Sequence, residues 1–126
     1  MVSPQITVNR MRTPDGTILQ SKSGHDYVTH LDKNGKRYML DGGFYYVRSS
    51  GNGDEEYLTL TVDSPFEEIR KYFTWGTRGK DGTSPLSFVF LKDMSTEHIK
   101  AILETQGHIR NTFVEDLFLK ELDFRK

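Results

Sequence analysis

The hydrophobic period is mostly strand-like in the first half of this chain and mostly helix-like in the second, and that difference constrains the fold more than any other feature. Residues 57–62 alternate apolar and polar side chains, which is the pattern of a half-buried strand. Residues 95–103 and 112–122 instead space their apolar side chains three or four positions apart, as a helix buried on one side requires. Strand patterns come first and helix patterns later, so we expect an α+β fold. An antiparallel sheet of N-terminal hairpins should pack against two or three C-terminal helices.

Residues 25–41 predict a β-hairpin. Asn34 and Gly35 both tolerate positive φ, which a two-residue type I′ turn needs at its two central positions. Counting outward from this turn pairs Leu31 with Tyr38. Because side chains alternate between the two faces of a strand, one face becomes mostly apolar and should face the core. That face carries Tyr27, Thr29, Leu31, Tyr38 and Leu40.

The remaining elements follow from turn and capping signals. Further strands are expected over residues 17–20, 44–48 and 86–91. Helices should begin after Ser64, Ser95 and Thr112, which are residue types that cap helix N-termini. Residues 1–12 are polar with scattered Val and Ile, and they predict a loose tail or an edge strand. We expect residues 1–126 to form a single domain.

Composition excludes several classes of protein. The 126 residues include no cysteine, which rules out a disulfide scaffold, a Cys-based zinc site, an iron–sulfur cluster and a thiol nucleophile. The net charge of −1 argues against a general nucleic-acid binder, which usually carries a basic surplus. Apolar runs are too short to span a membrane, and the first residues do not resemble a signal peptide. We therefore expect a cytoplasmic protein without a membrane partner.

Charge is distributed unevenly between the two halves of the chain. Residues 1–53 hold seven Lys or Arg and four Asp or Glu, whereas residues 54–126 hold ten and fourteen. The two net charges are therefore +3 and −4. This asymmetry indicates either two differently solvated faces or an N-terminal half that meets an anionic partner.

The glycine-rich segment 75–82 is a candidate anion site. Backbone N–H groups of such a loop can cradle a phosphate, two cations can pair with it, and Trp75 can stack on a base. The spacing does not match a Walker A motif, which needs four residues between its first Gly and Gly-Lys. In the alternative interpretation, Trp75 fills the core and the segment only connects a helix to a strand. The candidate phosphate-binding residues are Trp75, Thr77, Arg78, Gly79 and Lys80.

Asp26, His30 and Asp32 alternate along one predicted strand, so their side chains share a face. Two carboxylates and an imidazole within reach of one another can hold a divalent metal, which would suit a hydrolase. Against this interpretation, Asp32 has a potential ion-pair partner in Arg37 across the hairpin.

A third candidate is an interface. Tyr45 and Tyr46 point to opposite sides of a predicted strand, so one of them should reach the surface, and Arg48 shares the face of Tyr46. Exposed Tyr and Arg are typical of protein interfaces, so Tyr46 and Arg48 are candidate contact residues. No Gly-x-Ser-x-Gly nucleophile elbow is present, which favours a binding protein over an enzyme.

Several segments of the chain resemble a known protein family. They cover Thr13–Ser21, His25–Asp32, Tyr38–Gly43, Phe73–Gly82 and Met94–Leu103. Together they resemble an uncharacterised family of small accessory proteins from tailed bacteriophages, over residues 12 to about 125. The resemblance implies a phage protein made in the cytoplasm of a bacterial host, and it implies no catalytic residue.

Three hypotheses of function follow. The first is a non-enzymatic protein that binds or inhibits a host factor, including a factor of a defence system. The second is a sponge that sequesters a nucleotide immune signal with the 75–82 loop, and the third is a metal-dependent hydrolase. The expected partner is a host protein or a nucleotide-like ligand, with no cofactor. A homo-oligomer is a further alternative that the sequence leaves open.

Overall fold

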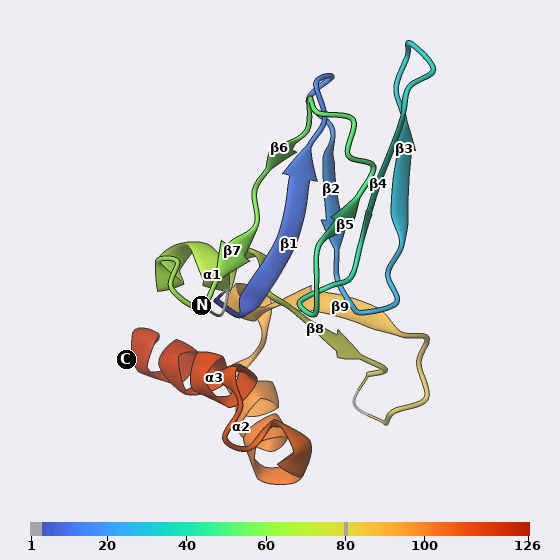
Figure 1. Cartoon of the computed structure of the whole chain (residues 1–126). Coiled ribbons are helices and arrows are strands. Elements are labelled where there is room, and N and C mark those ends of the chain that lie inside the picture. Colours follow the sequence, from blue (N-terminus) through green and yellow to red (C-terminus); the bar gives the residue numbers. More distant parts are fainter. Residues whose placement is uncertain (1–3, 80) are drawn as a thin grey trace. The chain divides into compact units, whose positions relative to one another are not determined.

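Antiparallel strands fill the first half of the chain, and the helices lie in the second half together with one short hairpin, as the change of hydrophobic period predicts (Figure 1). The computed structural model describes residues 4–79 and 81–126. Contacts divide the chain into unit 1 (Met1–Pro65) and unit 2 (Phe66–Lys126). The α+β class is therefore confirmed. Within the described residues, no helix is both long and apolar enough to cross a membrane.

In unit 1, one sheet is built around strand β1 (Ile6–Arg12). Strand β2 (Ile18–Ser21) pairs with one edge of β1. Two short strands, β6 (Glu56–Tyr57) and β7 (Leu60–Thr61), also pair with β1. All pairings are antiparallel. The strand expected over 57–62 is therefore present only in two pieces, which residues 58–59 separate.

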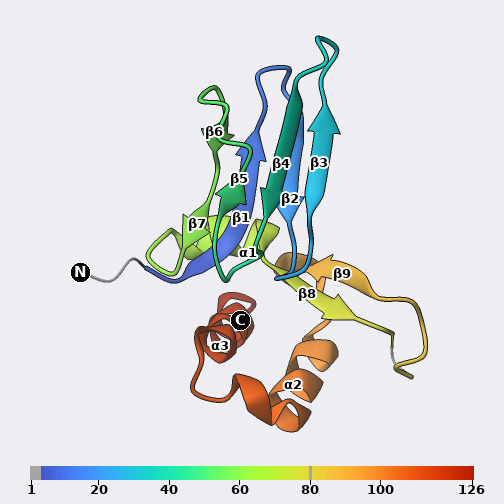
Figure 2. The same ribbon diagram turned by 45° about the vertical axis from the view of Figure 1, so that its right-hand side comes forward.

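A second sheet of unit 1 has the order β3-β4-β5. Strand β3 (Val28–Leu31) and strand β4 (Arg37–Asp41) form the long hairpin in Figures 1 and 2, and β5 (Arg48–Ser49) pairs with β4. Residues 44–47, expected in a strand, form a turn and its continuation instead. The two sheets share a small core of buried side chains: Met11, Leu19, Tyr38 and Leu40, with Val28 packed against them.

The N-terminal segment differs from its prediction. Residues 6–12 were expected in a loose tail or an edge strand, yet β1 lies at the centre of its sheet. Thr7, Val8, Asn9 and Met11 are all buried. Because Thr7, Val8 and Asn9 are consecutive and side chains alternate between faces, β1 is covered on both faces and buries polar as well as apolar side chains. The polar composition that suggested a tail was therefore misleading.

The β3–β4 hairpin has a register one residue away from the predicted one. His30, and not Leu31, lies opposite Tyr38. The loop has three residues, and Gly35 alone adopts positive φ (82°), which is typical of a type I turn closed by a bulge. The wider loop is stabilised by the Asp32 carboxylate, because its Oδ1 accepts the N–H groups of Asn34 (2.9 Å) and Lys36 (2.8 Å).

This shift moves the side chains of β3 to the opposite face, since side chains alternate with a period of two. Val28 and His30 lie on the face of Tyr38 and Leu40. Leu31 is 60% exposed. The prediction that Tyr27, Thr29 and Leu31 face the core is therefore wrong, because all three are exposed.

Unit 2 combines helices with one short hairpin. Helix α1 (Phe66–Tyr72) precedes strands β8 (Thr74–Thr77) and β9 (Ser87–Phe90), which pair with each other. Ser95 caps the second long helix by accepting the N–H of His98, as its residue type predicts. The later elements are 3₁₀-helix η1 (Leu91–Asp93), α2 (Thr96–Thr105), 3₁₀-helix η2 (Gly107–Ile109) and α3 (Phe113–Phe124).

A buried carboxylate on α3 ties unit 2 together. Glu121 is 0% exposed, and its two oxygens accept hydrogen bonds from Arg70 Nε (2.7 Å) and Nη2 (2.8 Å). Arg125 Nε donates to the same carboxylate at 2.7 Å. Arg125 also donates to Thr96 Oγ1 and to the Leu91 carbonyl. The network therefore connects α1, η1, α2 and α3 through one buried charge.

Candidate functional site

The glycine-rich segment places its predicted phosphate-binding residues at the end of β8 and in the loop that follows. Trp75 is partly buried, and its ring lies edge-on against Phe118 with centroids 5.3 Å apart. That contact matches the alternative in which Trp75 fills the core of its own unit. Arg78 and Gly79 are exposed. Lys80 lies outside the described residues.

Three backbone N–H groups of this loop donate to oxygen atoms within the loop. Gly79 N–H donates to Thr77 Oγ1 at 3.1 Å. Gly82 N–H donates to the Gly79 carbonyl at 3.2 Å, and Ser84 N–H donates to the Arg78 carbonyl at 2.9 Å. A phosphate nest needs several adjacent N–H groups free to converge on an anion, and here these three are already used.

The predicted metal ligands each have another partner. Asp26 Oδ2 accepts the Lys22 N–H at 2.8 Å, and Asp32 orders its own turn as described above. His30 Nε2 lies 2.8 Å from Oδ2 of Asp15, a residue that the sequence analysis did not select. In the two described ranges, 4–79 and 81–126, no three His, Asp or Glu side chains come together as a metal site would require.

Asp15 belongs to a group of carboxylates that order the loops at one end of unit 1, where loops 13–17, 32–36 and 50–55 all lie in both views (Figures 1 and 2). Hydrogen bonds from the Thr13 hydroxyl, from His30 and from the Thr17 N–H hold the pKa of Asp15 well below its usual range. Its carboxylate is therefore already satisfied and is a poor general base at neutral pH.

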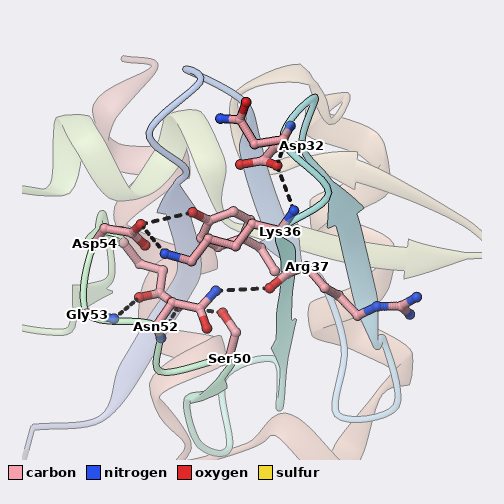
Figure 3. A network of polar contacts seen from close by, with 10 residues as sticks. Asp32, Lys36, Arg37, Ser50, Asn52, Gly53 and Asp54 are labelled. Atoms are coloured by element: carbon pink, nitrogen blue, oxygen red, sulfur yellow. Dashed lines mark hydrogen bonds and ion pairs between the residues drawn. The ribbon is translucent and has the colours of Figure 1, made fainter.

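Figure 3 shows the rest of this loop network. Asp54 Oδ2 accepts hydrogen bonds from Lys36 Nζ (2.7 Å) and from the Tyr38 hydroxyl (3.1 Å), and both lower the pKa of Asp54. Burial raises the pKa of Glu55. Hydrogen bonds from Ser50 and from the N–H groups at positions 52 and 53 outweigh burial and hold that pKa at about 2. Asp54 and Glu55 therefore stabilise loops through their hydrogen bonds.

The opposite end of unit 1 presents aromatic side chains. Residues 42–47, which we call the aromatic turn, follow β4 directly and include the candidate Tyr46. Tyr45 is 71% exposed and Tyr46 is 48% exposed. The neighbouring loop 22–27 adds Tyr27, which is 54% exposed. These two segments expose four large apolar side chains, which we call the tyrosine patch: Tyr27, Tyr45, Tyr46 and Val47.

Buried polar side chains of the first sheet form hydrogen bonds with the backbone of the aromatic turn. Asn9 of β1 is buried, and its Nδ2 donates to the carbonyls of Asp41 and Tyr46, at 3.1 Å each. Ser21 of β2 accepts the Gly43 N–H at 3.0 Å and donates to the Asp26 carbonyl at 2.7 Å. The turn and loop 22–27 are therefore both anchored to the first sheet through neutral hydrogen bonds.

Glycine makes the close approaches in this region possible. Gly42 has φ of 111°, and a Cβ there would lie 2.0 Å from the Tyr46 carbonyl oxygen. A Cβ on Gly24 would lie 2.6 Å from the ring of Tyr45. These distances are shorter than real Cβ contacts allow, so the positions of Tyr45 and Tyr46 depend on glycine at both sites.

Arg48, the second interface candidate, begins β5 next to the aromatic turn. Its Nη2 forms an ion pair with Asp41 Oδ2 at 3.0 Å, while the Arg48 side chain stays largely exposed. Tyr46 and Arg48 are predicted contact residues, whereas nothing in the sequence pattern predicted the exposure of Tyr27 or the anchoring contacts of Asn9. The Asp41-Gly42-Gly43 segment directly before four apolar residues is the signal in the sequence that marks this tight turn.

No protein family, characterised protein or solved structure matches this chain. The chain's own geometry therefore has to support any assignment of function.

Proposed function

We propose that the chain is a non-enzymatic binding protein whose tyrosine patch docks a partner protein. The observation that carries the proposal is the exposure of Tyr45 on a turn that buried hydrogen bonds hold and whose close approaches only glycine allows. Tyrosine offers a large contact area with few rotatable bonds, and it is enriched among the residues that dominate binding energy. A surface ordered before binding loses less entropy when the complex forms.

The partner in this proposal is a host factor of the bacterium in which a phage accessory protein would act. The resemblance to phage accessory proteins motivates this choice, and inhibition of a defence system is one such role. The nucleotide-sponge alternative has less support, because loop N–H groups after β8 are used within the loop and Trp75 packs on Phe118. The hydrolase has less support still, because Asp26, His30 and Asp32 have separate partners.

The test is affinity capture from bacterial lysate with the full chain and with a Tyr27→Ala/Tyr45→Ala variant. Tyr57→Ala is the matched control, because Tyr57 is 48% exposed but lies on β6, outside the tyrosine patch. We expect one host protein to be enriched by the natural chain and by Tyr57→Ala. With that partner purified, the double variant should bind at least about 30-fold more weakly, the effect of losing one hot-spot residue.

Two results would contradict the proposal. One is a lysate in which the natural chain enriches no protein over an unrelated bait. The other is a partner that the double variant retains with unchanged affinity while its circular dichroism spectrum shows a normal fold.

A further inference from the structure

Unit 2 carries an apolar hollow that the proposed function does not use. A hollow of about 400 Å³ opens between the start of α1 and the end of α3. Its apolar walls are Phe66, Leu119 and Phe124, and the last two are about half exposed. Lys120 and Asp123 form its polar rim.

The aromatic wall of this hollow is held in place. The Arg70 guanidinium lies 4.3 Å from the ring centroid of Phe124, within the range of a cation–π contact. Phe66 meets the same ring edge-on at 6.0 Å. Arg70 in turn is fixed by its two hydrogen bonds to the buried Glu121. Arg70 and Phe66 therefore hold the Phe124 ring in the position that shapes this hollow.

A second hollow of about 570 Å³ adjoins the first and shares Leu119 and Asp123 with it. It adds Lys100, Arg125 and Lys126 to the lining. The two hollows together present four cations and one carboxylate, in a chain whose net charge is −1. Arg125 is paired with Glu121, and Lys126 lies 3.9 Å from Asp123. Within the described residues, no carboxylate forms an ion pair with Lys100 or Lys120.

We propose that the two hollows bind an acidic segment of a partner protein. A bulky apolar side chain of that segment enters the hollow walled by Phe66, Leu119 and Phe124. Carboxylates on either side of it pair with Lys120 and Lys100. Charge complementarity selects an acidic occupant, and the apolar wall explains why a carboxylate alone would bind poorly. The hollows are open at the surface, which suits a peptide chain better than an alkyl tail that needs enclosure.

The probe is a fluorescein-labelled peptide in which a central Phe-Leu pair is flanked on each side by Glu residues. Its binding to the full chain is followed by fluorescence anisotropy and by amide chemical shifts. Two matched peptides accompany it, one with Lys in place of Glu and one with Ser-Ser in place of Phe-Leu. We expect only the first peptide to bind, with shifts confined to residues of α1, α2 and α3.

Two variants test the residues. Lys100→Glu/Lys120→Glu should weaken binding about tenfold or more, because two attractive contacts become repulsive. Leu119→Ser should weaken binding to a similar degree by removing the apolar wall. Lys33→Glu/Arg37→Glu makes the same charge change at two exposed positions of the β3–β4 hairpin of unit 1 and should leave the affinity unchanged. Trp75 fluorescence shows whether each variant keeps the fold of unit 2.

The proposal is overturned if millimolar probe peptide does not bind, if the Ser-Ser peptide binds equally well, or if both hollow variants keep the natural affinity. Anionic phosphatidylglycerol vesicles that bind and displace the peptide would assign the hollows to a lipid surface and would also overturn it. The tyrosine patch is not involved in any of these measurements, so the two proposals succeed or fail separately.

Discussion

The aromatic turn of unit 1 and helix α3 of unit 2 both present apolar side chains, but different chemistry holds them. Neutral groups anchor the aromatic turn, chiefly the Asn9 amide and the close contact at Gly42. A buried charge anchors α3, because Glu121 bonds two arginines. The stability of the neutral anchor therefore depends on the fit of its atoms, whereas the stability of the ionic anchor depends on both partners staying charged.

The largest expected effect is the loss of the ionic anchor. Glu121→Ala leaves Arg70 and Arg125 partly buried without their carboxylate, so we expect the free energy of unfolding to fall by about 3–5 kcal/mol. Urea unfolding followed by Trp75 fluorescence reports on unit 2, because Trp75 is the chain's single tryptophan. Asp116→Ala, an exposed position on the same helix, should cost less than about 1 kcal/mol. Equal effects of the two substitutions would show that the network contributes little.

The second effect is steric and concerns the neutral anchor. Gly42→Ala combines backbone strain at positive φ with a collision against the Tyr46 carbonyl, so we expect a loss of roughly 2–4 kcal/mol. Gly82→Ala is the matched control, since Gly82 also has positive φ (73°) but would meet nothing within 4 Å. It should cost only about 1–2 kcal/mol. Hydrogen exchange of peptides spanning residues 42–47 would locate the effect, and a larger cost at Gly82 would refute this account.

The third effect is the loss of two hydrogen bonds. Asn9→Ala removes the donor that serves the Asp41 and Tyr46 carbonyls, so we expect a loss of about 1–3 kcal/mol. Faster hydrogen exchange in the aromatic turn should accompany it. Gln5→Ala, which removes an exposed donor to the Phe44 carbonyl, should have a smaller effect. Unchanged exchange in the Asn9 variant would mean that glycine contacts alone define the turn.

The smallest effect is a dependence on pH. Burial raises the pKa of Glu121, but Arg70 and Arg125 outweigh burial and hold that pKa below its ordinary value. A depressed pKa means that the contribution is complete above the unfolded value of about 4.5 and is lost as pH falls through the folded value. Unit 2 of the natural chain should therefore lose stability below about pH 4.5, and Glu121→Gln should lose less. Parallel pH curves for the two proteins, measured by Trp75 fluorescence, would contradict this prediction.

The candidate sites show how far sequence patterns reach. Tyr46 and Arg48 could be selected because Tyr45 and Tyr46 point to opposite sides of the expected strand, so one should be exposed, and Arg48 shares the face of Tyr46. Their partners could not, because Asn9 and Glu121 act through contacts with residues far away in the chain. The glycine-rich segment 75–82 misled for the same reason. Its composition suits a phosphate nest. In the structure, however, Gly79 N–H forms a hydrogen bond within the loop and Trp75 packs against Phe118.

The sequence by itself determined the α+β class, because alternation and helical spacing are local consequences of side-chain geometry. It also determined that a hairpin turns near Gly35, since few residues adopt positive φ. Only the tertiary structure decided the hairpin register, because Val28, Tyr38 and Leu40 pack on one face of the hairpin against side chains of β1 and β2. It likewise decided which glycines matter, because a close approach such as that of Gly42 to Tyr46 exists only when distant strands have packed.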